Sequence, residues 1–173
     1  MPERGEELYR VRLDKRARLL AQGISPYPPR WPRTHTTRQA VDLFLQAEAQ
    51  EGASARTAPV RVAGRVTALR RMGGASFVDL RDGEGRIQAH LRQDLLGDAY
   101  DFFLDFVDLG DFLGVEGPVF RTRRGEVTVE AHRLALLCKA LRPPPEKWHG
   151  LRDVETRLRH RELDLMASSG NWT

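Results

Sequence analysis

One strand-like segment places an aromatic side chain on the face that its core residues do not use. In "ASFVDL", Val78 and Leu80 share one parity and are predicted to face a core, because side chains alternate between the two faces of a strand. Phe77 then lies on the opposite face with Asp79. An exposed aromatic ring stacks on a nucleobase for roughly 1 to 3 kcal/mol. The segment therefore predicts contact with single-stranded nucleic acid, the alternative being a strand aromatic covered by the N-terminal helices.

Polar groups from two further segments are predicted on the same face. In "GRIQAHL" and "GEVTVEA" the same alternation turns aliphatic residues inward and six polar ones outward: Arg86, Gln88, His90, Glu126, Thr128 and Glu130. Amide, carboxylate and guanidinium groups beside a stacking ring can read the edge of a base. A uracil presents one N–H donor between two carbonyl acceptors, so a carboxylate together with Arg or Gln complements it.

Arg70 does not follow this alternation. Counting from Val62 and Val66, strict parity turns Arg70 inward. It reaches the outer face only if the first strand carries a bulge, which we expect near Gly64 or past Leu69.

No catalytic or metal-binding constellation is expected. Asp79 and Asp82 fall at or near turns, where Asp is favoured for local hydrogen bonds, and Ser76 has no neighbour in the sequence that would activate it. No phosphate-binding loop is present, and the five histidines lack the paired spacing of metal ligands. The single cysteine, Cys138, ends an apolar run and is interpreted as a small buried residue rather than a reactive thiol. We therefore expect no catalytic residue, no metal and no cofactor in this chain.

Two helices are predicted before the strands begin. Residues 6–22 form a basic amphipathic pattern ended by Gly23, with a stripe through Leu8, Val11, Arg12, Lys15 and Leu19. After a proline-rich loop, Thr36 and Gln39 have the spacing of a capping box, which predicts a second helix to about Gln50.

The rest of the order is that of a small barrel. Alternating patterns predict strands over 60–69, 75–80 and 86–91, then a helix within 94–110, then strands over 111–120 and 125–137. Three strands, one helix and two strands is the order of a five-stranded OB-fold barrel, whose outer face often binds single-stranded nucleic acid. A barrel of this kind without a ligand is the alternative. The predicted class is α+β, mainly β, with an N-terminal helical extension (1–58), an OB-fold domain (59–142) and a proline-rich linker with a connector helix (143–173).

Charge and hydropathy narrow the class of protein. No apolar run approaches a membrane span and the N-terminus lacks a signal core, so we expect a cytoplasmic protein with no membrane partner. The net charge is +4, but residues 1–40 hold nine Lys/Arg against four Asp/Glu, whereas residues 94–120 hold seven acidic residues and no basic one. Such a molecule can orient on a polyanion, although ordinary solvated faces explain the charges equally well.

Four blocks of the sequence resemble the N-terminal anticodon-binding region of class II lysyl-tRNA synthetase: "ISPYPPRWPRTH", "VAGRVTALRRMGGASFVDLRDGEGRIQ", "DLGDFLGVEGPVFRTRRGEVTV" and "LRPPPEKWHGLRDVETRLRHRELDL". The barrel alone is similar to aspartyl and asparaginyl synthetases as well, whereas the "PYP" loop and the "KWHGLRD" connector single out the lysyl family. The resemblance implies that Phe77 stacks on an anticodon base. It implies that Arg70, Gln88 and Glu126 hydrogen-bond anticodon bases.

The connector departs from the family. Where the family reads "RYRQRYLDL", this chain has Leu158 and Glu162 in place of two tyrosines and His160 in place of a glutamine. The match ends at Ala167, so the catalytic domain, with its ATP, Mg and lysine sites, is expected to lie beyond the last residue. A helix from Val154 to Met166 is expected to pack loosely against the barrel.

The resemblance therefore predicts a domain that binds lysine tRNA but does not aminoacylate it alone. Its other expected partner is a synthetase catalytic domain or a full-length synthetase. Two alternatives stay open. One is a sequence-tolerant single-strand binder or interaction module, and the other is a remnant of an interrupted synthetase gene without a role.

Overall fold

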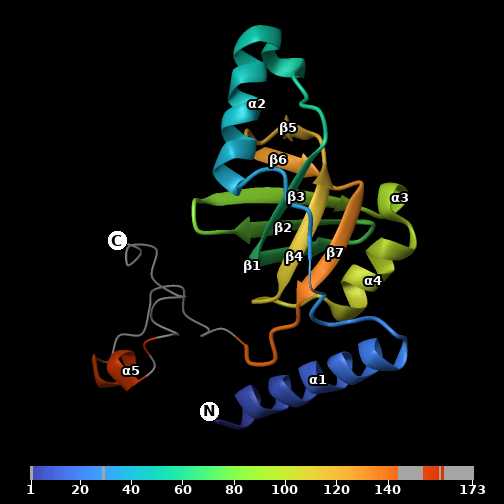
Figure 1. Cartoon of the computed structure of the whole chain (residues 1–173), viewed down its shortest axis with the longest axis vertical. Helices are drawn as coiled ribbons and strands as arrows, with labels where there is room; N and C mark the ends of the chain where they lie inside the picture. The colour runs from blue at the N-terminus through green and yellow to red at the C-terminus, as the bar shows by residue number, and fades with distance from the viewer. Residues whose placement is uncertain (1, 29, 144–153, 160, 162–173) are drawn as a thin grey trace.

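The computed structural model describes residues 2–28, 30–143, 154–159 and 161 of the 173-residue chain. The elements follow one another along the chain as Figure 1 shows: α1 (Pro2–Ala21), α2 (Thr37–Glu51), the short 3₁₀ helix η1 (Gly52–Ser54), β1 (Val60–Met72), β2 (Ala75–Arg81), β3 (Arg86–Arg92), α3 (Gln93–Leu96), α4 (Asp98–Phe106), β4 (Phe112–Gly117), β5 (Val119–Arg121), β6 (Val127–Glu130), β7 (Arg133–Cys138) and α5 (Val154–Arg159).

The strands form one sheet in the order β5-β6-β3-β2-β1-β4-β7. β1 is long enough to pair with β4 through its first half and with β2 through its second. β3 pairs with β6 in parallel, and every other pair is antiparallel. β5 and β7 stand at the two ends of this order. β5 continues from β4, which pairs with β7, and β7 continues from β6, which pairs with β5. The sheet therefore closes on itself, as in an OB-fold barrel.

The described barrel has seven strands where five were predicted, because each of the last two predicted strands is interrupted once. Pro118 separates β4 from β5, since proline has no backbone N–H to donate to the sheet. Its carbonyl still accepts from the N–H of Glu130, and the N–H of His132 donates to Glu116. The interruptions are therefore local bends in two strands of the same barrel.

Alternation along the strands builds the core. β2 alternates strictly between buried and half-buried residues, with Val78 and Leu80 fully buried as predicted. One end of the barrel is closed by α4 through Tyr100, Phe103 and Phe106. The predicted single helix of 94–110 is in fact two, because Gly97 adopts a positive φ of 53° between α3 and α4.

α2 begins at the predicted capping box. The Thr36 hydroxyl accepts from the Gln39 N–H at 3.2 Å, and the Gln39 side chain accepts from the Thr36 N–H at 2.9 Å. Asp82, in the turn between β2 and β3, accepts from both the N–H and the hydroxyl of Thr37. Phe44 is buried, and α2 packs against β1, β3 and β5. The turn after β2 therefore fixes where α2 starts.

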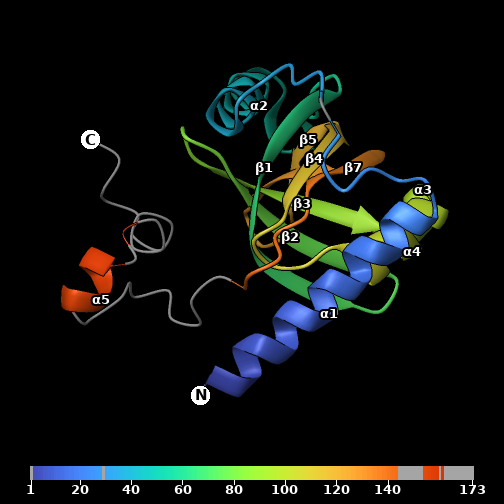
Figure 2. The same cartoon turned by 60° about the horizontal axis from the view of Figure 1, so that its bottom comes forward.

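α1 docks through the second part of the predicted stripe, in which Leu19 is fully buried and two basic side chains find partners. Arg12 is buried and donates to the carbonyls of Leu109 and Ala140, and Lys15 binds Asp108 at 2.7 Å. Leu8 and Val11, at the start of the same stripe, are 39% and 48% exposed. Figure 2 shows α1 lying along α4, and the guanidinium of Arg18 lies 5.0 Å from the Phe106 ring centroid.

The end of the chain is described only in part. α5 begins at Val154 as predicted, and the exposed side chains of Val154 and Leu158 agree with the expected loose packing. The predicted helix end at Met166, most of the proline-rich linker and the changed residues His160 and Glu162 lie outside the described residues. No described helix is long and apolar enough to cross a membrane.

Cys138 is half-buried rather than buried. Burial, followed by the negative charge of Asp111, raises the pKa of its thiol above the ordinary value, which favours the unreactive protonated form.

Candidate nucleic-acid interface

The outer face of the barrel carries a row of side chains that crosses four strands. Cross-strand register pairs Arg70 of β1 with Phe77 of β2, Phe77 with His90 of β3, and His90 with Glu130 of β6. Cross-strand partners of this kind lie on the same face of a sheet. We call Arg70, Phe77, His90 and Glu130 the stacking row.

A bulge places Arg70 in this row. The register of β1 against β2 shifts between Val66 and Ala68, so Thr67 is the extra residue. The predicted bulge exists, although it lies between the two positions expected for it. Arg70 is exposed, and its guanidinium carbon lies 5.8 Å from the Phe77 ring centroid. One extra residue in β1 therefore explains how Arg70 reaches the outer face, although strict alternation along the strand would turn it inward.

Phe77 is on the outer face, as predicted, and it is already stacked. Its ring lies parallel to the imidazole of His90, with centroids 4.4 Å apart and an interplanar angle of 4°. Alternation alone had placed His90 outward, but no signal in the sequence indicated that the two rings would meet. The interface therefore presents a pair of stacked rings with a guanidinium beside it.

The surroundings of His90 favour its neutral form. Burial, followed by the positive charge of Arg92, lowers the pKa of the imidazole below its ordinary value of 6.5, and the carboxylates of Glu130 and Asp94 only partly oppose this. Glu130 itself is held by Arg56 at 2.7 Å and by the ring of His132 at 3.1 Å. A neutral ring stacks on Phe77 without bringing a further charge to the row.

A second row runs beside the first and contains Ala68, Asp79, Gln88 and Thr128, again paired by register. Gln88 and Thr128 were expected to be exposed there, and this is wrong: they are 4% and 0% exposed. In the same strand as Gln88, two residues before it, Arg86 reaches Asp79 of β2 and Glu126 next to β6.

Glu126, the fourth predicted site residue, is bound by a cation. Arg86 donates to Asp79 at 2.7 Å and to Glu126 at 2.5 Å. Burial acts to lower the pKa of Arg86, but these two carboxylates raise it above its ordinary value. The Glu126 side chain is still 42% exposed, so one side of the carboxylate is open to a ligand.

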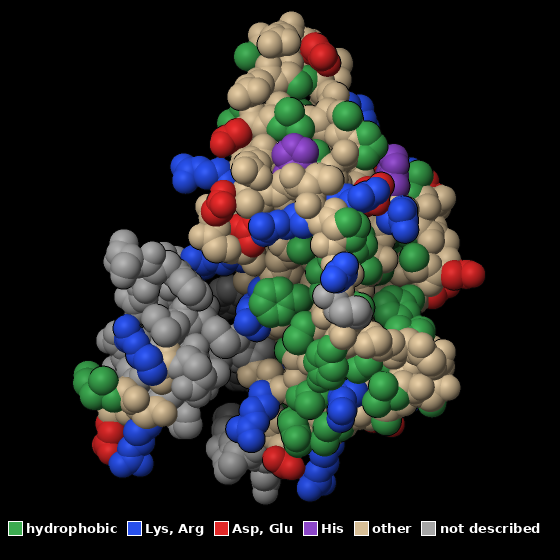
Figure 3. Space-filling view, in the orientation of Figure 1, with side chains coloured by type: hydrophobic (Ala, Val, Ile, Leu, Met, Phe, Trp, Pro, Cys, Tyr) green, Lys and Arg blue, Asp and Glu red, His purple; other side chains and the backbone are tan. Residues whose placement is uncertain are grey.

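Of the four predicted site residues, the structure thus brings Arg70 and Phe77 into contact. Gln88 is buried in the neighbouring row, and Glu126 is bound to Arg86 of β3. Sequence reasoning placed Arg86 outward without giving it a role. Among the described residues, no group of three or more His, Cys, Asp or Glu is arranged to hold a metal ion. Figure 3 shows Lys and Arg side chains exposed across the middle of the molecule on the side seen in Figure 1.

Residues 60–137 match a family described as an OB-fold nucleic acid binding domain. Over 169 residues, 98% of the chain, the sequence is 46% identical to a protein named Lysine--tRNA ligase from Dehalococcoides mccartyi, covering 33% of that ligase. Proteins of the same name from Pelotomaculum thermopropionicum and Thermosipho africanus are 47% and 39% identical over 94% of the chain, covering 30% and 32% of their own lengths. The chain spans about a third of the length of the curated relatives it matches.

Proposed function

Residues 60–137 belong to the OB-fold nucleic acid binding domain family, in a chain of the lysyl-tRNA synthetase type, and we propose that the protein reads the anticodon of a tRNA with its outer face. The observation that carries this proposal is the stacking row, in which Arg70, Phe77 and His90 lie side by side across three strands. Unstacked bases of RNA loops are recognised by such aromatic platforms beside hydrogen-bonding groups.

Each predicted site residue has a role in this proposal. An anticodon base stacks on the exposed part of the Phe77 ring system, and Arg70 donates to a carbonyl of a base. Glu126 accepts from an N–H through its open oxygen, while Arg86 holds the carboxylate in place. Gln88 is 4% exposed in the free chain, so it reaches a base only after neighbouring side chains move.

The relatives named Lysine--tRNA ligase indicate lysine tRNA as the partner, whose uridine-rich anticodon suits this chemistry. We assign tRNA binding, and not the ligase reaction, to residues 1–173. In this proposal ATP and Mg²⁺ act in the part of the relatives that these residues do not cover, and a catalytic domain supplied there is the second partner.

Binding of the 173-residue chain to lysine tRNA, compared with the same tRNA carrying a changed central anticodon uridine, tests the proposal. We expect the change to weaken binding by at least the roughly 1 to 3 kcal/mol of one base contact. Equal affinities for both tRNAs and for unrelated RNA, with a steep salt dependence, would instead identify a sequence-tolerant single-strand binder.

A further inference from the structure

A third row on the outer face consists of arginines. Register pairs Arg65 of β1 with Arg81 of β2, and Arg81 with Arg86 of β3. Val66, Leu80 and Ile87, which form the adjacent register row, are buried in the core, so the arginines point outward. We call Arg65, Arg81 and Arg86 the arginine row.

The three guanidiniums differ in how their charge is compensated. Arg86 is held between the carboxylates of Asp79 and Glu126. The Arg65 side chain, in contrast, donates to the carbonyl of Gly110 at 3.2 Å and lies 4.4 Å from the ring centroid of Phe112. Neither of these partners is anionic, so Arg65 keeps its full positive charge.

Arg81 has fewer contacts than Arg65. Within the described part of the chain, its side chain has no hydrogen bond, ion pair or ring contact. The next residue, Asp82, makes no ion pair with Arg81: its carboxylate accepts from backbone N–H groups of the turn and of α2 and lies 3.8 Å from the guanidinium of Arg33. Arg81 is half-buried on the outer face.

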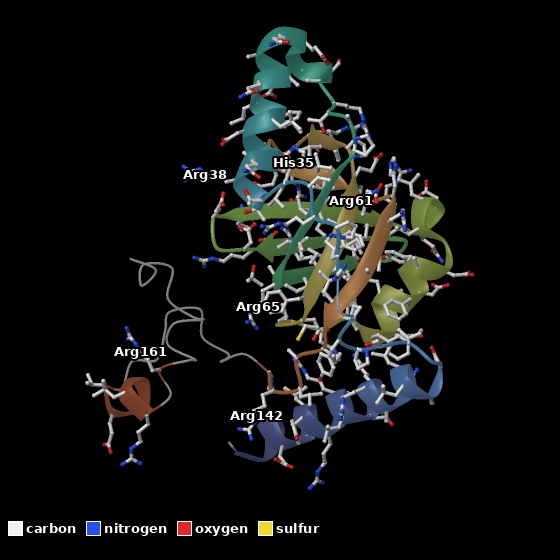
Figure 4. The ribbon with its side chains drawn as sticks, viewed as in Figure 1. His35, Arg38, Arg61, Arg65, Arg142 and Arg161 are labelled. Atoms are coloured by element: carbon white, nitrogen blue, oxygen red, sulfur yellow. The ribbon has the colours of Figure 1, made fainter. Side chains whose placement is uncertain are left out.

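Charge therefore changes along the row. The β1–β2 side carries the uncompensated Arg65 and Arg81, whereas the β3–β6 side carries two carboxylates that share Arg86. Figure 4 labels Arg65 on β1, where its guanidinium lies beside Phe112 at the start of β4. A polyanionic strand is attracted to the first side and repelled by the second, while its uncharged bases are free to extend toward the carboxylates.

The distance between the rows suits such an arrangement. Successive outward residues of a strand are about 6.6 Å apart, so the arginine row runs about 13 Å from the stacking row. A nucleotide strand can bridge that distance with a base on Phe77 and its backbone over Arg81.

We propose that Arg65 and Arg81 contact phosphates of the RNA strand whose bases are read at the stacking row. This inference rests on the proposed function and adds to it a backbone contact that no base-reading residue supplies. Phosphate contacts fix the register of a nucleic acid and carry no sequence information themselves. The two arginines thus set affinity and salt dependence, and the stacking row sets specificity.

Charge-removing substitutions test this with the 173-residue chain. Arg65→Gln and Arg81→Gln are compared with the unsubstituted chain in binding lysine tRNA and its anticodon-changed form between about 50 and 200 mM salt. We expect each substitution to lower the slope of log Kd against log salt by about one. Both tRNAs are expected to weaken by the same factor, so that their affinity ratio is unchanged.

Two control variants distinguish a phosphate contact from the loss of a positive charge elsewhere on the surface. Arg133→Gln removes the same charge from an arginine whose side chain is 71% exposed on β7, and it is expected to leave the slope unchanged. Arg65→Lys keeps the charge but loses the planar group over Phe112, and it is expected to retain the slope. The proposal is overturned if Arg65→Gln and Arg81→Gln match Arg133→Gln, or if they weaken only the lysine tRNA.

Failure of the proposed function gives a different result. In that case the unsubstituted chain binds both tRNAs equally, yet the salt slopes of the variants still report on the phosphate contacts. Absence of any tRNA binding overturns both proposals together.

Discussion

Arg70 and Phe77 are cross-strand partners on the outer face of β1 and β2, and they meet only because Thr67 is bulged out of the ladder between the two strands. Without that extra residue, the parity that buries Val62 and Val66 would also turn Arg70 into the core. The guanidinium instead lies 5.8 Å from the Phe77 ring centroid, and His90 stacks on the same ring at 4.4 Å. Three strands thus contribute one side chain each to the stacking row.

Replacing Phe77 by alanine is expected to weaken tRNA binding by about 1 to 3 kcal/mol, because the proposed stacking of its ring on an anticodon base is lost. Phe77→Leu keeps an apolar side chain without the π system and is expected to weaken binding by a similar amount. Fluorescence titration with labelled lysine tRNA measures both. Unchanged affinity in a variant that melts like the unsubstituted chain would remove Phe77 from the interface.

The partial burial of His90 makes the stability of the chain depend on pH. The pKa of His90 is lowered in the folded state, so the unfolded chain takes up the proton first as the pH falls below about 6.5. The free energy of unfolding therefore decreases with falling pH in that range. His90→Phe keeps a ring on Phe77 without a titrating group and is expected to flatten this decrease. Urea unfolding between neutral and mildly acidic pH measures it, and parallel curves for the two proteins would argue against the assignment.

Lys139 is fully buried and its ammonium binds Asp108 at 2.6 Å, Asp111 at 2.7 Å and the carbonyl of Phe106 at 2.8 Å. Lys139→Met leaves the buried carboxylate of Asp111 without its cation and is expected to cost about 3 to 5 kcal/mol of unfolding free energy. Adding Asp111→Asn removes the stranded charge and is expected to recover part of the loss. Chemical denaturation of the single and double variants measures both. A double variant no more stable than the single one would contradict this account.

Thr36 holds the start of α2 by accepting from the N–H of Gln39, and its hydroxyl also donates to Glu84 at 2.8 Å. Thr36→Ala is expected to lower the unfolding free energy by about 1 kcal/mol, a usual cost of losing an N-cap. Thr36→Ser keeps the hydroxyl and is expected to be nearly neutral. Thermal unfolding distinguishes the two, and equal losses would show that the methyl group rather than the cap matters.

The outward position of Phe77 was predictable because Val78 and Leu80 alternate with it and the core takes the aliphatic side. The position of Arg70 was not, since it depends on which residue of β1 is left unpaired. That choice arises from pairing β1 with both β4 and β2. Local alternation indicated that a bulge was needed but not that Thr67 would supply it.

Two other differences come from side chains that are distant in sequence. Glu126 is held by Arg86, an ion pair that spans 40 residues. The stripe predicted for α1 contained Arg12 and Lys15, but not their partners, which lie about 100 residues away. Hydrophobic periodicity predicts the elements, but it does not predict which charges pair across the fold.

The most direct test of anticodon reading is a cycle that combines one protein change with one RNA change. Affinities are measured for the unsubstituted chain and Phe77→Ala, each with lysine tRNA and with the tRNA whose central anticodon uridine is changed. If Phe77 stacks on that base, the RNA change weakens the unsubstituted chain and has a clearly smaller effect on Phe77→Ala, because the two changes remove the same contact. The same factor of weakening in both proteins would contradict the account.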